Sequence, residues 1–150
     1  MKLQLSAIGF AFGLAFAGAA SAEPYVDYTP QKGAWEIQTY KIDPNHIDDY
    51  LTGLKKEYVP VLEILKRHGI IDQYIVMQKL NGQGGGENIM VIQHYPNLSV
   101  LDPDKTRDQQ IEKEIYAVVS KQDADKAEVE FNKYRQFAAD DYWTVVDFPH

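Results

Sequence analysis

Residues 70–95 read IIDQYIVMQKLNGQGGGENIMVIQHY, and no other stretch of the chain constrains the architecture as strongly. Two apolar runs, Ile70 to Leu80 and Glu87 to Tyr95, flank a glycine-rich segment, which predicts two strands joined as a hairpin. Apolar side chains occupy both alternating faces of each run, whereas a sheet with one wet face would alternate apolar with polar residues. We therefore expect both faces of the sheet to be covered.

Upstream of the hairpin, the chain predicts a strand followed by a long helix. Ala34 to Ile42 alternates apolar and polar residues, as a half-buried strand does. Asp43-Pro44-Asn45 then combines a capping side chain with a proline suited to a first helical turn. Helical spacing of apolar residues follows, and Gly69 stands where a helix stops. Pro60 interrupts the pattern, so we expect a kink near Tyr58-Val59.

Downstream of the hairpin, the chain predicts two helices and a last strand. The apolar face of the first helical region comprises Ile111, Ile115, Val118 and Val119. We expect Asp123 to cap a further helix whose apolar positions extend through Tyr134 to Ala138. Asp140-Asp141 is then interpreted as a turn, and Tyr142 to Phe148 as the final strand.

These elements follow the order β-α-β-β-α-α-β, which defines an α+β fold class. The order is that of a ferredoxin-like split βαβ plan with an antiparallel sheet and a divided second helix. Helices would cover one face of the sheet. A second copy of the chain, related by a two-fold axis, is the economical cover for the other face, so two sheets would pack together in a homodimer.

The first 22 residues indicate a secretory signal peptide. A short positive start at Met1-Lys2 precedes an apolar run to Ala19, and Ala20-Ser21-Ala22 supplies the small residues of a cleavage site. The alternative is a membrane anchor, for which the apolar run is short. We expect cleavage before Glu23, a periplasmic or secreted location, an extended arm over 23–33 and one α+β domain over 34–148.

Composition narrows the range of partners. The formal net charge is −7, and removal of Lys2 with the leader would make the mature chain more negative still. An acidic balance argues against binding to nucleic acid or to an anionic membrane surface. The chain contains no cysteine, so an exported form would rely on its apolar core and not on disulfides.

Several segments resemble the dimeric α+β barrel superfamily, and more narrowly a set of small exported bacterial proteins without an assigned activity. The matching residues are Tyr40 to Leu51 (YKIDPNHIDDYL), Pro60 to Glu63, Lys66, Gly69 to Ile71, Tyr74, Asn88 to Val91, Tyr95 and Asn97-Leu98. They mark a helix opening, a kink and a core strand, and they form no catalytic signature. That superfamily contains haem-degrading enzymes, cofactor-free oxygenases, isomerases, dehalogenases and non-enzymes, so the resemblance implies a dimeric fold and leaves the function open.

One histidine is the candidate catalytic residue. His94 lies near the end of a core strand, where it would serve as a general base or an axial haem ligand. The alternative is a structural histidine with one hydrogen bond. The candidate ligand-binding residues, which would line a cavity between sheet and helices, are Tyr74, Trp35, Tyr134, Arg135 and Trp143. Aromatic residues at such positions also serve as plain core, and an inward Arg135 would hold a carboxylate.

Two other groupings receive structural interpretations. His46, Asp48 and Asp49 suit the start of a helix better than a metal site, so no metal is expected. Gly82 to Gly86 lacks the lysine of a phosphate-binding loop and leads into a strand, which indicates a hairpin.

Three functional hypotheses follow. The first is an exported homodimer that binds a small apolar or carboxylate ligand without a cofactor. The second is a small oxygenase-type enzyme, either cofactor-free or haem-binding, that uses His94 in the cavity between sheet and helices. The third is an interaction module that acts through an exposed helix face.

Overall fold

The computed structural model describes residues 22–80 and 85–149. Its main sheet contains four antiparallel strands in the order β3-β4-β2-β5. Their bounds are Ala34–Ile42 for β2, Gln73–Gln78 for β3, Ile89–Tyr95 for β4 and Arg135–Trp143 for β5. Because β4 lies between β2 and β3 and is antiparallel to both, the first and second long strands form a split βαβ unit. The predicted ferredoxin-like α+β fold is confirmed.

The long helical segment between β2 and β3 contains the predicted irregularity. A short 3-10 turn, Pro44–His46, leads into α1, Ile47–Gly53, and the Asp43 side chain accepts a hydrogen bond from the Asn45 backbone N–H. A π-helical turn over Leu54–Tyr58 separates α1 from α2, Val59–Arg67. Pro60 has no N–H, and the Val59 N–H bonds to the Leu54 carbonyl, so the turn widens next to the proline.

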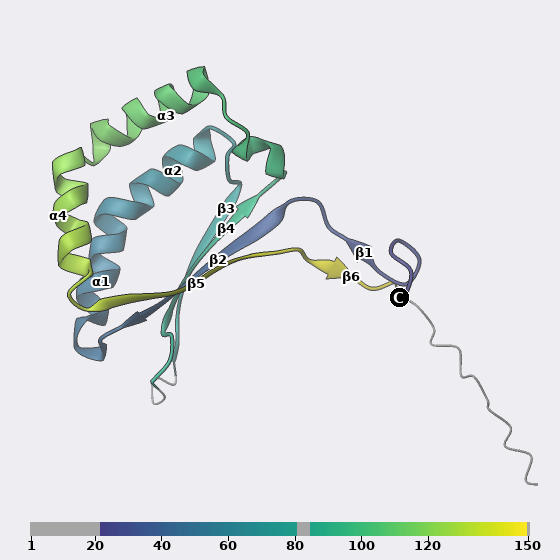
Figure 1. The fold of residues 1–150 in the computed structure, drawn as a ribbon, viewed down its shortest axis with the longest axis horizontal. Helices are drawn as coiled ribbons and strands as arrows, with labels where there is room; N and C mark the ends of the chain where they lie inside the picture. The colour runs from purple at the N-terminus through teal and green to yellow at the C-terminus, as the bar shows by residue number, and fades with distance from the viewer. Residues whose placement is uncertain (1–21, 81–84, 150) are drawn as a thin grey trace, which may run out of the picture.

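The second helical segment contains the two predicted helices, but the start and the end of the second helix differ from the prediction. The helix α3 spans Lys105–Val118 and α4 spans Lys121–Phe131. Ser120 caps α4 by accepting from the Asp123 N–H, so the expected cap at Asp123 is wrong. In Figure 1, α2 lies between α3 and the strands, and α3 packs against α2.

The last strand begins well before the predicted position. Arg135–Trp143 forms β5, so the expected helix through Ala138 and the expected turn at Asp140-Asp141 are both wrong. The register with β2 passes from Thr39 opposite Ala139 to Tyr40 opposite Phe137, which leaves Ala138 as a bulge. A bulge breaks the period of two, and the acidic pair suits an edge strand, so the sequence pattern imitates a helix and a turn.

The two faces of the sheet have different surroundings. On the helix side, Ile89 and Val91 of β4 are buried against α1, the π-helical turn and their neighbours. A second cluster joins Leu62, Ile64 and Tyr95 beneath α3. On the other side, which we call the open face, lie the alternate residues Trp35, Ile37, Thr39, Ile75, Met77, Met90, Ile92, His94 and Trp143. Among these, Met77, Met90 and Trp143 are at least 40% exposed.

A small ribbon extends from one end of the main sheet. Its strands are β1, Thr29–Pro30, and β6, Val146–Asp147, which pair antiparallel. Figure 1 shows this ribbon projecting away from the helices and the main sheet. The signal peptide predicted over 1–22 lies, apart from its last residue, outside the described residues. Within the described ranges, no helix is both long enough and apolar enough to span a membrane.

Candidate functional site

The structure divides the sequence-predicted site residues between the two faces of the sheet. Trp35 pairs across the sheet with both His94 and Trp143, and all three lie on the open face. Tyr74 and Arg135 lie on the helix side with Tyr134, which immediately precedes β5. The six residues therefore do not line one cavity, and the expected position of His94 between sheet and helices is wrong. The cause is the strand's period of two, because its neighbours Gln93 and Tyr95 face the helices.

His94 has an ordered environment on the open face. Its Nδ1 atom lies 2.6 Å from Asp72 Oδ1, and its ring centroid lies 4.7 Å from that of Trp35. A Cβ added to Gly33 would lie 3.0 Å from His94 Nε2 and 2.2 Å from the Tyr95 carbonyl oxygen. Gly33 therefore lies against the Nε2 side of the imidazole ring. Asp72 supplies the orienting carboxylate that the sequence did not reveal, and its position beside Gln73, which pairs with His94, is the available signal.

The aromatic candidates on the helix side have separate partners. The Tyr74 hydroxyl donates to Glu63 Oε1 over 2.6 Å, and this bond raises the pKa of the phenol. Tyr134 stacks on the His46 ring with 4.7 Å between centroids. His46 Nδ1 lies 3.0 Å from Asp49 Oδ2, and no group of three potential metal ligands occurs within the described part of the chain.

A buried carboxylate that the sequence did not single out is the centre of a polar network. Glu36 on β2 is only 6% exposed, and it has no cationic partner among the described residues. Its Oε2 atom accepts from the Tyr95 hydroxyl at 2.7 Å and from Gln93 Nε2 at 3.1 Å. Its Oε1 atom accepts from Gln38 Nε2 at 3.2 Å and from the Tyr142 hydroxyl at 3.3 Å. Neutral donors alone therefore satisfy both carboxyl oxygens of Glu36 inside the domain.

The direction of these hydrogen bonds matters for a ligand. Gln93 Nε2 also donates to the Tyr58 hydroxyl oxygen at 3.3 Å. Among residues 22–80 and 85–149, that hydroxyl forms no side-chain hydrogen bond as a donor, so its hydrogen is available. Burial raises the pKa of Tyr58 to about 12 and also raises the pKa values of Tyr40 and Tyr95. Tyr58 therefore stays protonated at neutral pH and acts as a donor, not as a base.

A cleft of about 430 Å³ adjoins Tyr58 between α2, α3 and α4. Its lining residues are Glu57, Tyr58, Val61, Ile115, Tyr116, Val119, Ala124, Ala127, Glu128, Phe131 and Arg135. The Arg135 guanidinium carbon lies 5.6 Å from the Tyr40 ring centroid and 5.7 Å from that of Phe131. Glu57 Oε2 is buried and has no hydrogen-bond partner in the part of the chain that the structure describes. The cleft thus combines apolar walls with a few polar groups.

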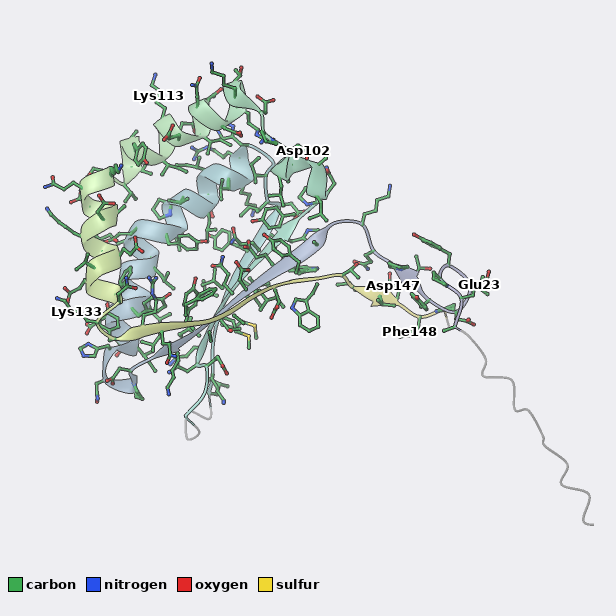
Figure 2. The ribbon with its side chains drawn as sticks, viewed as in Figure 1. Glu23, Asp102, Lys113, Lys133, Asp147 and Phe148 are labelled. Atoms are coloured by element: carbon green, nitrogen blue, oxygen red, sulfur yellow. The ribbon has the colours of Figure 1, made fainter. Side chains whose placement is uncertain are left out.

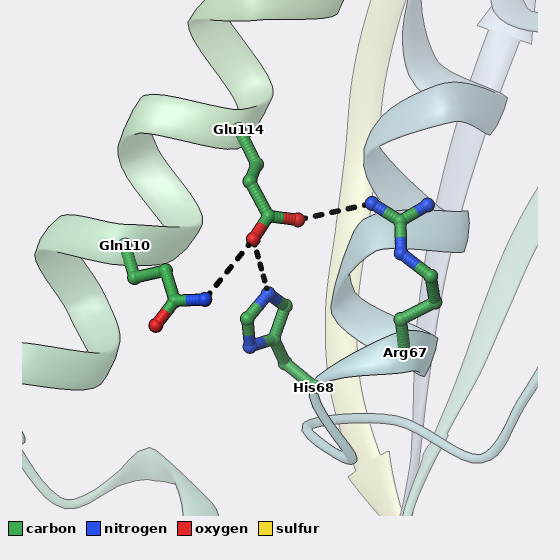
Figure 3. Close-up of polar contacts among 4 residues, drawn as sticks. All are labelled: Arg67, His68, Gln110 and Glu114. Carbon is green, nitrogen blue, oxygen red and sulfur yellow. Dashed lines mark hydrogen bonds and ion pairs between the residues drawn. The ribbon is translucent and has the colours of Figure 1, made fainter.

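An ion-pair cluster holds two walls of the cleft together. Figure 3 shows Glu114 of α3 between Arg67 and His68 at the end of α2. Glu114 Oε2 lies 3.0 Å from Arg67 Nη2, and Oε1 lies 3.1 Å from His68 Nε2. Arg67, His68 and Gln110 together lower the pKa of the Glu114 carboxyl. His68, which follows the last residue of α2, thus ties α2 to α3.

Comparison with known proteins adds little detail. A dimeric protein of unknown function with a ferredoxin-like fold from Bacteroides fragilis is 12% identical, with a TM-score of 0.41; the match covers 80% of this chain and 99% of that chain. A protein from Agrobacterium tumefaciens is also 12% identical, with a TM-score of 0.38, over 75% of this chain and 90% of that chain. No family model and no curated protein matches this chain.

Proposed function

We propose that this protein is an exported homodimer that binds a small, mostly apolar molecule carrying a carboxylate or carbonyl group. The observation that supports the proposal is the convergence of Tyr58 and Arg135 on one cleft with apolar walls. The Tyr58 hydroxyl oxygen accepts from Gln93 Nε2, and among the described residues no side chain accepts its hydrogen. An acceptor on the ligand would satisfy Tyr58 and Arg135 together, and charge-assisted bonds from arginine are stronger than neutral ones.

The other residues of the cleft would contact the apolar part of the ligand. Val61, Ile115 and Phe131 contribute aliphatic and aromatic walls from three different helices. Glu57 Oε2 would accept a hydrogen bond from a hydroxyl or amine on the same ligand, because a buried carboxylate oxygen without a donor is costly. A flat hydroxy-acid or a similar small molecule fits this set of groups.

The homodimer is supported by the chemistry of the open face. Ile37, Ile75 and Ile92 lie side by side at its centre. The protein is acidic overall, so two copies repel each other across most of their surfaces. The isoleucines at the centre of this face are where a second copy could pack with the least of that repulsion. Export rests on residues 1–22 of the sequence and is tested by the intact mass of soluble protein, which would retain the leader if the proposal is wrong.

Ligand binding can be tested by nuclear magnetic resonance with naphthalene-1-carboxylate as the probe. Shifted amide signals should map to α2, α3 and α4 around Tyr58. The Tyr58→Phe variant should weaken binding about tenfold, which corresponds to one hydrogen bond of ~1.4 kcal/mol. Tyr25→Phe is the matched control, because Tyr25 is 76% exposed and distant from the cleft. Shifts confined to the open face, or equal affinity for the two variants, would contradict the proposal.

An acid–base enzyme is the second candidate, and the His94–Asp72 contact is the observation that favours it. A carboxylate on Nδ1 orients the ring, as in many catalytic histidines. In such an oxygenase-type enzyme, His94 would remove a proton from a substrate held on the open face. Oxygen uptake with a dihydroxynaphthalene should then fall to the background rate in His94→Ala and partly in Asp72→Asn. A rate equal to that of the buffer alone for the wild type would contradict this candidate, and a haem absorbance band would show directly whether the protein carries haem.

A further inference from the structure

The ribbon formed by β1 and β6 has few internal contacts to hold it. Its pairs are Thr29 opposite Asp147 and Pro30 opposite Val146. The Gln31 N–H donates to the Val145 carbonyl, and Gln31 Nε2 donates to Asp147 Oδ2. An isolated two-stranded ribbon is marginally stable in water, because one layer cannot bury its apolar side chains. The ribbon therefore needs a surface to rest on.

Exposed side chains that flank the strands of the ribbon indicate an apolar surface as that support. Phe148 is 70% exposed, Tyr25 is 76% exposed and Val26 is 63% exposed. Figure 2 shows Asp147, Phe148 and Glu23 together at the far end of the ribbon, away from the helices. Large apolar residues grouped on a projecting segment indicate an interaction surface.

The open face contains a groove at the end opposite the ribbon. This groove, of about 360 Å³, includes Thr39, Met77 and Met90, and Lys79 and Glu87 lie at its edge. Met77 is half exposed and Met90 is 40% exposed. Methionine side chains adapt to aromatic partners and make favourable sulfur contacts with their rings. The groove thus has the composition that would accept an aromatic side chain.

The two features cannot meet within one protomer. The ribbon follows Trp143, which pairs with Trp35 at the start of β2, whereas Met90 pairs with Thr39 near the other end of that strand. At about 3.3 Å per residue along the strand direction, Phe148 lies on the order of 30 Å from Met90 of its own chain. A two-fold axis that runs across the strands would reverse one sheet over the other, and would bring each ribbon to the groove of the other copy.

We propose that the β1–β6 ribbon of each protomer packs into the Met77–Met90 groove of a second copy of this chain. The inference rests on the proposed dimer. The ribbon and the open face form one continuous surface, because Trp143 and Val145 at the base of the ribbon line a depression with Trp35 and Ile75. One pair of opposite charges also favours this placement, because Asp147 of the ribbon would approach Lys79 at the groove of the second copy.

Cysteine cross-linking tests this placement, because the natural chain contains no cysteine. The double variant Phe148→Cys with Lys79→Cys, treated with a short bismaleimide, should yield a covalent dimer. Each single variant should remain monomeric on a denaturing gel. The pair Phe148→Cys with Tyr116→Cys is the matched control, since Tyr116 is 46% exposed on α3, away from the open face. A covalent dimer from the control pair alone would overturn the placement.

A second measurement separates failure of this inference from failure of the dimer. Phe148→Ser combined with Val26→Ser should raise the dimer dissociation constant at least about tenfold, with unchanged circular dichroism, because two exposed apolar side chains lose their buried contacts. If the wild type is dimeric, the variant has the same dissociation constant and no cross-link forms at Lys79, then the ribbon placement alone is wrong. A wild type that is monomeric would overturn both proposals.

Discussion

Replacement of Glu36 by alanine is expected to destabilise the domain substantially. The carboxylate accepts four hydrogen bonds, and two of the donors, Tyr95 and Gln93, are 7% and 3% exposed. Each buried donor that loses its acceptor costs about 1–3 kcal/mol. Gln93 keeps its bond to Tyr58, and Tyr142 is exposed enough to reach water. The expected result is a loss of about 1–3 kcal/mol in the free energy of unfolding, mainly from the Tyr95 hydroxyl.

The assay is urea unfolding of Glu36→Ala followed by circular dichroism, with the slope of the transition checked against the wild type. Glu112→Ala is the control, because Glu112 is exposed on α3. Tyr95→Phe completes a double-mutant cycle, and the two changes together should cost less than the sum of the single changes. A loss within about 0.5 kcal/mol of zero for Glu36→Ala would refute the network, because that is the scale of ordinary surface substitutions.

Three further outcomes follow from single features of the structure. Burial raises the pKa of Tyr58 to about 12, so the unfolded chain loses this proton at a lower pH than the folded chain. The free energy of unfolding should therefore fall between pH 10 and pH 12, by up to about 1.4 kcal/mol per pH unit. Alkaline unfolding of Tyr58→Phe should show less of this loss. Gly53→Ala should lower stability by about 1–3 kcal/mol in a urea titration, because the new Cβ would lie 2.4 Å from Phe131 Cζ, whereas Gly85→Ala, which meets nothing, should be neutral. Because the pKa of the Glu114 carboxyl is lowered in the folded chain, this group stabilises the fold at pH values above its ordinary pKa, and the stabilisation is lost as the pH falls. Glu114→Gln should therefore flatten the acid limb of the melting-temperature profile. An unchanged limb would contradict the contact shown in Figure 3.

The sequence predicts the fold well where its pattern is regular. The strand Ala34–Ile42 and the disturbance next to Pro60 both occur as expected, because strand alternation and a missing N–H act locally. The last strand could not be placed, because the bulge at Ala138 interrupts the period of two that identifies a strand. This segment is a strand because it pairs with β2 along its whole length, and such pairing joins residues that are far apart in the sequence.

The candidate site was predicted less well, for two physical reasons. An error of one residue in the alternation of a strand reverses the face of every side chain, and for this reason His94 was predicted in the cavity but lies on the open face. The Glu36 network depends on residues far apart in the chain, since Glu36 joins Gln93 and Tyr142. The available signal is that Gln93 and Tyr95 share a face with the core residues Ile89 and Val91, which places polar groups inside the domain.

The most direct test of the account compares two neighbouring residues of β4 by sedimentation equilibrium. Ile92 lies on the open face, and Val91, which is 1% exposed, faces the helices. The account predicts a dimeric wild type, a folded monomer for Ile92→Glu and an unfolded chain for Val91→Glu, because neighbours on a strand point in opposite directions. A wild type that remains a well-folded monomer at high concentration would contradict the assignment of the open face to a second copy.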